Sequence, residues 1–232
     1  MKQHSPDLPN TPKIKDTQAE KDDKPLPIKS AYLSWEEGID IHGDRLPHWN
    51  QDNKYIFVTF RLSDSLPKDI QEALITEIKR WKSKHPLPWD KMTEREYYTK
   101  FSHKIEDLLD LGYGSGALRL PNVAQIIKDT LIYEDGINYE LIDYVIMPNH
   151  VHVLVRLLEE TQIETLTQRW KSISSHKIKK VMGNEWCGWM VKYYDRLIRD
   201  GNHFYNVLNY IQKNWSHGGV LKGSKPNTEK VD

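Results

Sequence analysis

Hydrophobic residues follow two kinds of pattern along the middle and the C-terminal part of the chain. Short segments that are apolar almost throughout predict buried strands, at Tyr55–Arg61, Tyr139–Met147 and His150–Leu157. Longer segments repeat their apolar positions at helical spacing and predict helices over 69–84, 93–109, 121–133, 161–182 and 203–214. Trp189–Tyr194 reads as one further short strand.

The order of these elements predicts an α+β fold. Strand, helices, two strands, helix, short strand and helix fit a four-stranded antiparallel sheet in the ferredoxin-like arrangement, with helices on one face. The helices between the first two long strands, about residues 68–120, would then be an insertion.

Both ends of the chain differ in composition from the patterned part. They are rich in Lys, Asp, Pro and Ser and carry few apolar residues. We expect a disordered or extended arm over residues 1–45, a single folded domain over 46–221 and a flexible tail over 222–232.

Composition narrows the class of protein. Mean hydropathy is −0.71, and no stretch approaches the roughly 18 apolar residues that a membrane span needs. The N-terminal segment has no apolar core of a signal peptide. Cys187 is the only cysteine, which excludes an internal disulfide and a cysteine-rich metal site. A cytoplasmic protein without a membrane partner is the simplest interpretation.

Charge is unevenly distributed although the formal net charge is zero. From Thr161 to the C-terminus there are twelve lysines and arginines against six acidic residues. Such a surface suits phosphate backbones. On charge alone, a solvated helix face explains it equally well.

The sharpest feature is the pair His150 and His152 within an apolar strand. Residues two apart in a strand point to the same face, so both imidazoles can bind one divalent ion. Two surface histidines are the alternative. The apolar flanks favour the metal site, because two buried histidines cost free energy unless a partner satisfies them.

The segment around this pair resembles a known family. Met147–Val155 reads MPNHVHVLV and is similar to the histidine motif of the HUH nucleases, most closely of the REP-associated tyrosine transposases. These are relatives of the single-tyrosine insertion-sequence transposases. The likeness extends over about Leu46–Val220 through Leu46–Trp49, Phe57–Pro67, Asp135–Tyr139, Tyr193–Asp200 and Tyr210–Asn214.

The resemblance implies a role for Tyr210 as the nucleophile and for Asn214 as a third metal ligand beside His150 and His152. The residues by themselves indicate only that Tyr210 and Asn214 share one helix face, and a packed ring with a helix cap explains them too. The sequence departs from the family where Trp215 follows Asn214 in place of the usual proline. Gly218-Gly219 would then end the helix.

The implied activity is that of a transposase-like endonuclease and strand transferase. It would cleave single-stranded, hairpin-forming repeat DNA through a covalent 5′-phosphotyrosine, as a monomer or homodimer. A divalent metal, Mg²⁺ or Mn²⁺, would assist, and two histidine ligands favour Mn²⁺. Candidate DNA contacts are Lys177, Lys180, Arg196, Arg199 and Lys213.

Three other functions stay open. One is a domesticated relative that binds hairpin DNA without cleaving it. Another is a two-histidine phosphoesterase, but that chemistry needs a histidine followed at the second position by Ser or Thr, a pattern which the chain lacks. The third is a purely structural metal-binding module, which a single cysteine disfavours.

Overall fold

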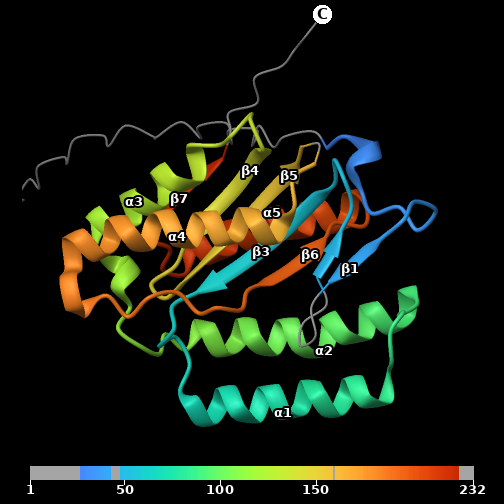
Figure 1. The fold of residues 1–232 in the computed structure, drawn as a ribbon, viewed down its shortest axis with the longest axis horizontal. Coiled ribbons are helices and arrows are strands. Elements are labelled where there is room, and N and C mark those ends of the chain that lie inside the picture. Colours follow the sequence, from blue (N-terminus) through green and yellow to red (C-terminus); the bar gives the residue numbers. More distant parts are fainter. Residues whose placement is uncertain (1–26, 43–47, 159, 225–232) are drawn as a thin grey trace, which may run out of the picture.

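A five-stranded antiparallel sheet forms the centre of the protein (Figure 1). The computed structural model describes residues 27–42, 48–158 and 160–224. The strand order is β6-β3-β5-β4-β7, and a separate two-stranded sheet pairs β1 (Asp40–His42) with β2 (His48–Asn50). The strands of the main sheet are β3 (Tyr55–Arg61), β4 (Tyr139–Ile146), β5 (His150–Leu157), β6 (Tyr194–Leu197) and β7 (Leu221–Ser224).

The helices begin and end where local chemistry favours it. Asp90 and Asp200 cap α2 and α5 by accepting hydrogen bonds from the backbone N–H of Thr93 and His203. Pro121 occupies the first turn of α3, where its missing N–H costs nothing. The helices are α1 (Lys68–Lys84), α2 (Lys91–Asp110), α3 (Pro121–Ile132), α4 (Ile163–Met182) and α5 (Gly201–Ser216), with short turns η1 (Lys29–Ala31), η2 (Ala117–Arg119) and η3 (Gly183–Glu185).

Helices cover both faces of the sheet. On one face, alternate residues of β5 such as Val153 share a core with Trp170 of α4 and Leu131 of α3. On the other face, Leu154 packs with Phe204 and Ile211 of α5. The predicted α+β antiparallel fold is confirmed. The prediction that the helices share one face was wrong, because the central strands are apolar on both sides and α5 buries the second face.

Two strand predictions also needed correction. The sheet has a fifth strand, β7, which pairs with β4. The short strand expected at Trp189–Tyr194 instead runs over Tyr194–Leu197, and Trp189 makes only an isolated bridge to Leu62.

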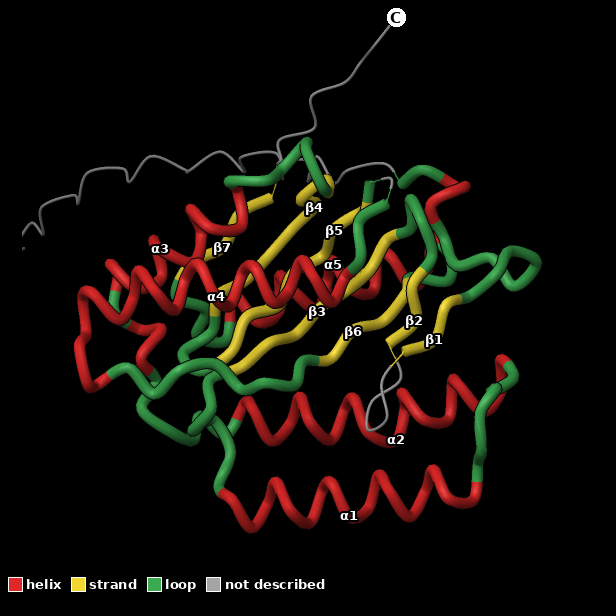
Figure 2. The backbone as a smooth tube through the Cα atoms, viewed as in Figure 1, coloured by secondary structure: helices red, strands yellow, loops and turns green. Residues whose placement is uncertain are grey.

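An antiparallel helix pair, α1 and α2, fills most of the predicted insertion at 68–120 (Figure 2). Trp81 of α1 packs its ring against Tyr97 and Phe101 of α2. The pair is attached to the sheet through α2, since the Tyr98 hydroxyl donates to the carbonyl oxygen of Asp195 in β6 at 3.2 Å. The insertion therefore lies along the β6 edge of the sheet.

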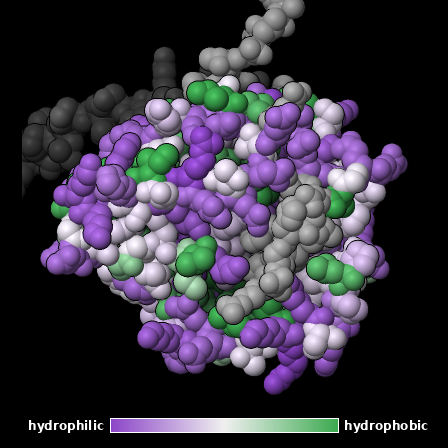
Figure 3. All heavy atoms as spheres, viewed as in Figure 1, coloured by the Kyte–Doolittle hydropathy of each residue, from purple (hydrophilic) through white to green (hydrophobic). Residues whose placement is uncertain are grey.

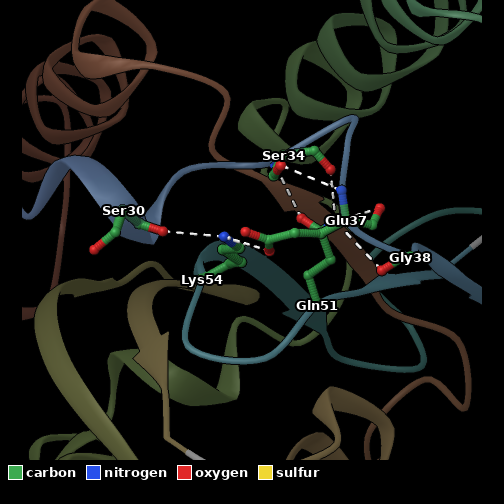
Figure 4. A network of polar contacts seen from close by, with 6 residues as sticks. All are labelled: Ser30, Ser34, Glu37, Gly38, Gln51 and Lys54. Atoms are coloured by element: carbon green, nitrogen blue, oxygen red, sulfur yellow. Dashed lines mark hydrogen bonds and ion pairs between the residues drawn. The ribbon is translucent and has the colours of Figure 1, made fainter.

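Part of the expected N-terminal arm packs against the domain. The Gln51 amide donates to the carbonyl oxygens of Ser34, Glu37 and Gly38 (Figure 4). The Lys54 ammonium donates to the Ser30 carbonyl oxygen at 3.0 Å. The rest of the arm before residue 27, residues 43–47 and the tail from residue 225 lie outside the described residues. The domain limits stay a prediction.

Hydrophilic side chains dominate the surface seen in Figure 3, and the hydrophobic ones on it are scattered. Within the described ranges, no helix has the length and apolar character needed to cross a bilayer.

Candidate functional site

The two histidines lie side by side beneath α5. His150 and His152 are 1% and 0% exposed, and their Nε2 atoms are 3.0 Å apart. Burial lowers the pKa of His150 to about 3. Burial, and then the neighbouring His150, lower the pKa of His152 well below its ordinary value. Both rings are therefore neutral at physiological pH, as metal ligation requires.

Asn149 fixes the tautomer of His150. Its amide nitrogen donates to the carbonyl oxygens of Leu109 at 3.2 Å and Tyr113 at 3.1 Å. This orientation turns Oδ1 toward Nδ1 of His150, at 2.7 Å. An amide oxygen can only accept, so Nδ1 of His150 carries the proton and Nε2 keeps its lone pair.

Thr59 holds His152 in a different way. Its hydroxyl lies 2.8 Å from Nδ1 of His152 and can donate or accept. When Thr59 donates, the Nε2–H of His152 can donate to Nε2 of His150. When Thr59 accepts, both Nε2 lone pairs are available, and neither ring has to move.

Tyr210 lies next to this pair within the same chain. Its hydroxyl oxygen is 3.4 Å from Nε2 of His152. The two rings meet edge-on, with their centroids 5.1 Å apart. The Phe57 ring stacks on His152 with a centroid distance of 5.4 Å. It also packs against Tyr210 in a T-shaped contact, with the centroids 6.0 Å apart. Burial, and then the nearby Glu106 carboxylate, raise the pKa of Tyr210 above its ordinary value. The hydroxyl is therefore protonated at neutral pH.

Asn214 lies one turn further along α5. Its amide nitrogen donates to the Tyr210 carbonyl oxygen at 3.0 Å. After Trp215 the helix ends as predicted at the glycine pair: Gly218 has φ 123°, and the Gly219 N–H donates to the Asn214 carbonyl oxygen at 3.2 Å. A positive φ is cheap only for glycine, which explains how the helix stops without proline.

A cavity of about 560 Å³, here called the histidine cavity, lies beside His150, whereas the fully buried His152 does not line it. His150, Tyr210 and Asn214 line it, together with the basic side chains of Arg119 and Lys213. Tyr210 is thus close to His152 on one side and opens to this cavity on another.

The residues present fit a divalent metal ion. Two imidazole nitrogens that bind one ion at about 2.1 Å and at right angles lie about 3.0 Å apart, which matches the separation of the two Nε2 atoms. Within the described part of the chain, no cluster of three or more His, Cys, Asp or Glu residues is placed to hold a metal. A third ligand from the described residues would therefore be an oxygen atom that belongs to neither Asp nor Glu, such as an amide oxygen.

Tyr210 also lines a second cavity, of about 340 Å³, here called the arginine cavity. Arg196 and Arg199 lie there, whereas Lys213 lines the histidine cavity. Lys177 and Lys180 are exposed on α4, which covers the opposite face of the sheet. The structure therefore brings three of the five candidate DNA contacts to Tyr210 and leaves two away from it.

Sequence reasoning missed the residues that orient the histidines. Asn149 lies between two predicted strands and Thr59 lies within another, and the pattern gives neither side chain a role. A polar residue inside an otherwise apolar strand is the signal that marks Thr59. Its partner, however, is His152, directly opposite on the neighbouring strand β5. Only the strand pairing shows that the two residues meet.

Residues 122–214 match the model of a family described as "Transposase IS200 like". No curated protein matches the chain.

Two solved structures are similar to it. One, described as "Structure of the REP associates tyrosine transposase bound to a REP hairpin", is 11% identical with a TM-score of 0.40, over 75% of this chain and 73% of that chain. The other, a putative transposase from Deinococcus radiodurans R1, is 13% identical with a TM-score of 0.33, over 69% of this chain and 89% of that chain.

The segment of this chain that matches the family model contains β4, both histidines, α4 and α5 as far as Asn214. The match agrees with the resemblance expected from the histidine motif: residues 122–214 are similar to the IS200-like transposases.

Proposed function

We propose that the protein cleaves and rejoins single-stranded DNA, with Tyr210 as the nucleophile. The observation that carries the proposal is the 3.4 Å separation between the Tyr210 hydroxyl oxygen and Nε2 of His152 within one chain. Three segments far apart in sequence, β3, β5 and α5, supply Thr59, the histidines and Tyr210. Their convergence supports a built site rather than two unrelated buried histidines.

In the proposed reaction, the Tyr210 oxygen attacks the phosphorus of a phosphodiester. The new bond is a 5′-phosphotyrosine, the bond to the 3′ oxygen breaks, and the tyrosine proton leaves while the 3′ oxygen gains one. Attack of a 3′-hydroxyl on the phosphotyrosine reverses the step and joins strands. Phe57 and His152 fix the Tyr210 ring on two sides, which limits the loss of orientational freedom on reaching the attack geometry.

His150, His152 and Asn214 would hold the divalent ion, Mg²⁺ or Mn²⁺. Bound there, the ion would polarise the scissile phosphate and offset the charge of the transition state. Asn149 and Thr59 support this role. Asn149 keeps Nε2 of His150 unprotonated, and Thr59 does the same for Nε2 of His152 when it accepts from Nδ1. Arg119 and Lys213 outnumber Asp110 among the charged residues that line the adjoining cavity, and an excess of positive charge suits a DNA backbone.

The resemblance to REP-associated transposases suggests hairpin-forming repeats as the substrate. Because Tyr210 reaches the histidines of its own chain, we further propose that one subunit completes its site alone. A homodimer that exchanges tyrosine helices is the alternative outcome.

The direct test is incubation of the protein with hairpin-containing single-stranded DNA and Mn²⁺ or Mg²⁺. We expect a protein–DNA adduct that resists denaturation, and Tyr210→Phe should abolish it. Tyr205→Phe is the matched control, because Tyr205 lies on the same helix and loses the same hydroxyl. An adduct that persists undiminished in Tyr210→Phe would refute the assignment of the nucleophile.

A further inference from the structure

The arginine cavity beside Tyr210 has no part in the chemistry proposed so far. Its walls come from α2 of the insertion, from β3, from β6 with the loop after it, and from α5. Its volume of about 340 Å³ falls in the range of about 300–1,000 Å³ that is typical of ligand pockets. Tyr210 lines this cavity and Asn214 does not.

Arg196 in β6 is the first pointer to a ligand. Its guanidinium lies 4.7 Å over the ring of Tyr98 in α2, which holds it in place. Its Nε is buried and has no hydrogen-bond partner, and no ion pair joins it to another described residue. Buried guanidinium groups normally have acceptors, so Arg196, which lines the cavity, keeps hydrogen-bonding capacity that the described residues do not use.

The neighbouring charges leave a positive wall. Arg199 is matched by the buried carboxylate of Glu94 at 3.0 Å, so its charge is already balanced. Arg95 is exposed on α2 and forms no ion pair with a described residue. It therefore adds a second available guanidinium to that of Arg196.

Acidic groups oppose this wall only weakly. Burial raises the pKa of Glu106 to about 7, so this carboxyl is partly uncharged at neutral pH. Asp195 is buried and already engaged in other contacts. The hydroxyl groups of Thr99 and Ser102, both on α2, also line the cavity and can donate to an anion.

We propose that the arginine cavity binds a phosphodiester of the DNA strand that Tyr210 attacks, next to the scissile one. Arg196 and Arg95 are its main donors. Guanidinium groups suit this ligand because their planar N–H pairs match phosphate oxygens. Tyr210 lines both cavities, so a strand whose scissile phosphate lies at Tyr210 would reach the arginine cavity on one flank. The inference rests on the proposed function and assigns the helical insertion a role as a DNA-binding wall.

The test measures binding of a short fluorescent oligothymidylate to the full chain across a range of salt concentrations. Tyr210→Phe protein in EDTA serves as the parent, so that cleavage and metal binding do not contribute. Variants are Arg196→Met, which removes the charge but keeps most of the stem, Arg196→Lys and Arg95→Ala. Arg80→Ala is the matched control, because Arg80 is an exposed arginine of the same insertion that does not line the cavity.

Each lost phosphate contact should reduce the slope of log affinity against log salt by about 0.7. We expect this change and a three- to tenfold weaker affinity near physiological salt for Arg95→Ala and for Arg196→Met. Arg196→Lys should recover much of the slope, and Arg80→Ala should match the parent. Arg95 is exposed, so its variant tests the proposal even if Arg196→Met fails to fold.

A parent that does not bind the strand, or an Arg95→Ala slope equal to that of Arg80→Ala, would overturn the proposal. Its failure is distinguishable from failure of the proposed function. If the strand binds with an arginine-dependent slope but protein with Tyr210 intact forms no covalent adduct, the cavity binds DNA and the cleavage assignment is wrong. If the adduct forms but the slopes are equal, cleavage stands and the cavity assignment is wrong.

Discussion

The tautomer lock at Asn149 gives the sharpest prediction about the histidine site. Asn149→Ala removes three hydrogen bonds, to Leu109, Tyr113 and His150. All three lie at the base of the site, and Asn149 itself is only 2% exposed. At about 1 kcal/mol each, their loss should lower the free energy of unfolding by about 3 kcal/mol. His150 should also become free to carry its proton on Nε2, where it cannot ligate.

We therefore expect Asn149→Ala to weaken Mn²⁺ binding by about 10- to 100-fold, the usual effect of removing a hydrogen-bond partner behind a ligand. Calorimetric titration of Mn²⁺ into the DNA-free protein measures this directly. In the adduct assay, the concentration of Mn²⁺ giving half-maximal rate should rise by the same factor. The maximal rate should change much less, because Tyr210 keeps its contacts.

A second variant separates stability from metal affinity. Asn149→Asp keeps the acceptor for Nδ1 of His150 but places an oxygen against the carbonyl oxygens of Leu109 and Tyr113. This variant should be less stable than wild type in urea denaturation. It should nevertheless bind Mn²⁺ more tightly than Asn149→Ala does, because it keeps the tautomer of His150. Asn202→Ala, at an exposed position of α5, is the control for the loss of an asparagine. Equal Mn²⁺ affinity in wild type and Asn149→Ala would refute the tautomer argument.

Two further predictions follow from the sheet. Thr59→Val keeps the shape of the side chain but removes the hydrogen-bond partner of Nδ1 in His152. The affinity for Mn²⁺ should therefore fall by about tenfold, whereas Thr59→Ser should keep the wild-type affinity. Equal affinities of Thr59→Val and wild type in the calorimetric titration would contradict this. Burial raises the pKa of Asp143 to about 7, partly offset by its hydrogen bond from the Tyr144 N–H, so its carboxyl penalises the folded state progressively as pH rises from about 4 to about 7. Asp143→Asn should therefore be more stable than wild type at pH 8, by at most about 4 kcal/mol, and should show no such gain near pH 4. Urea denaturation at both pH values checks this, and an equal difference at both would contradict it.

The sequence by itself determined most of the local structure. The strands expected at Tyr55–Arg61 and His150–Leu157 have those bounds in the structure, because β-branched and aromatic runs leave few alternatives. The two-residue period of a strand also placed His150 and His152 on one face before any fold was known. The resemblance to the family then singled out Tyr210 among the tyrosines of the chain.

Only the tertiary structure decided how these pieces meet. The helical period of Gly201–Ser216 shows which side of the helix is apolar, but it does not show which face of the sheet that side covers. Packing of Phe204 and Ile211 on the face of Leu154 sets this, and it brings Tyr210 to His152 across 58 residues of chain. Asn149 likewise depends on carbonyl groups at the end of α2 and in the loop after it. Contacts of this kind arise from packing between distant segments, and a local pattern carries no information about them.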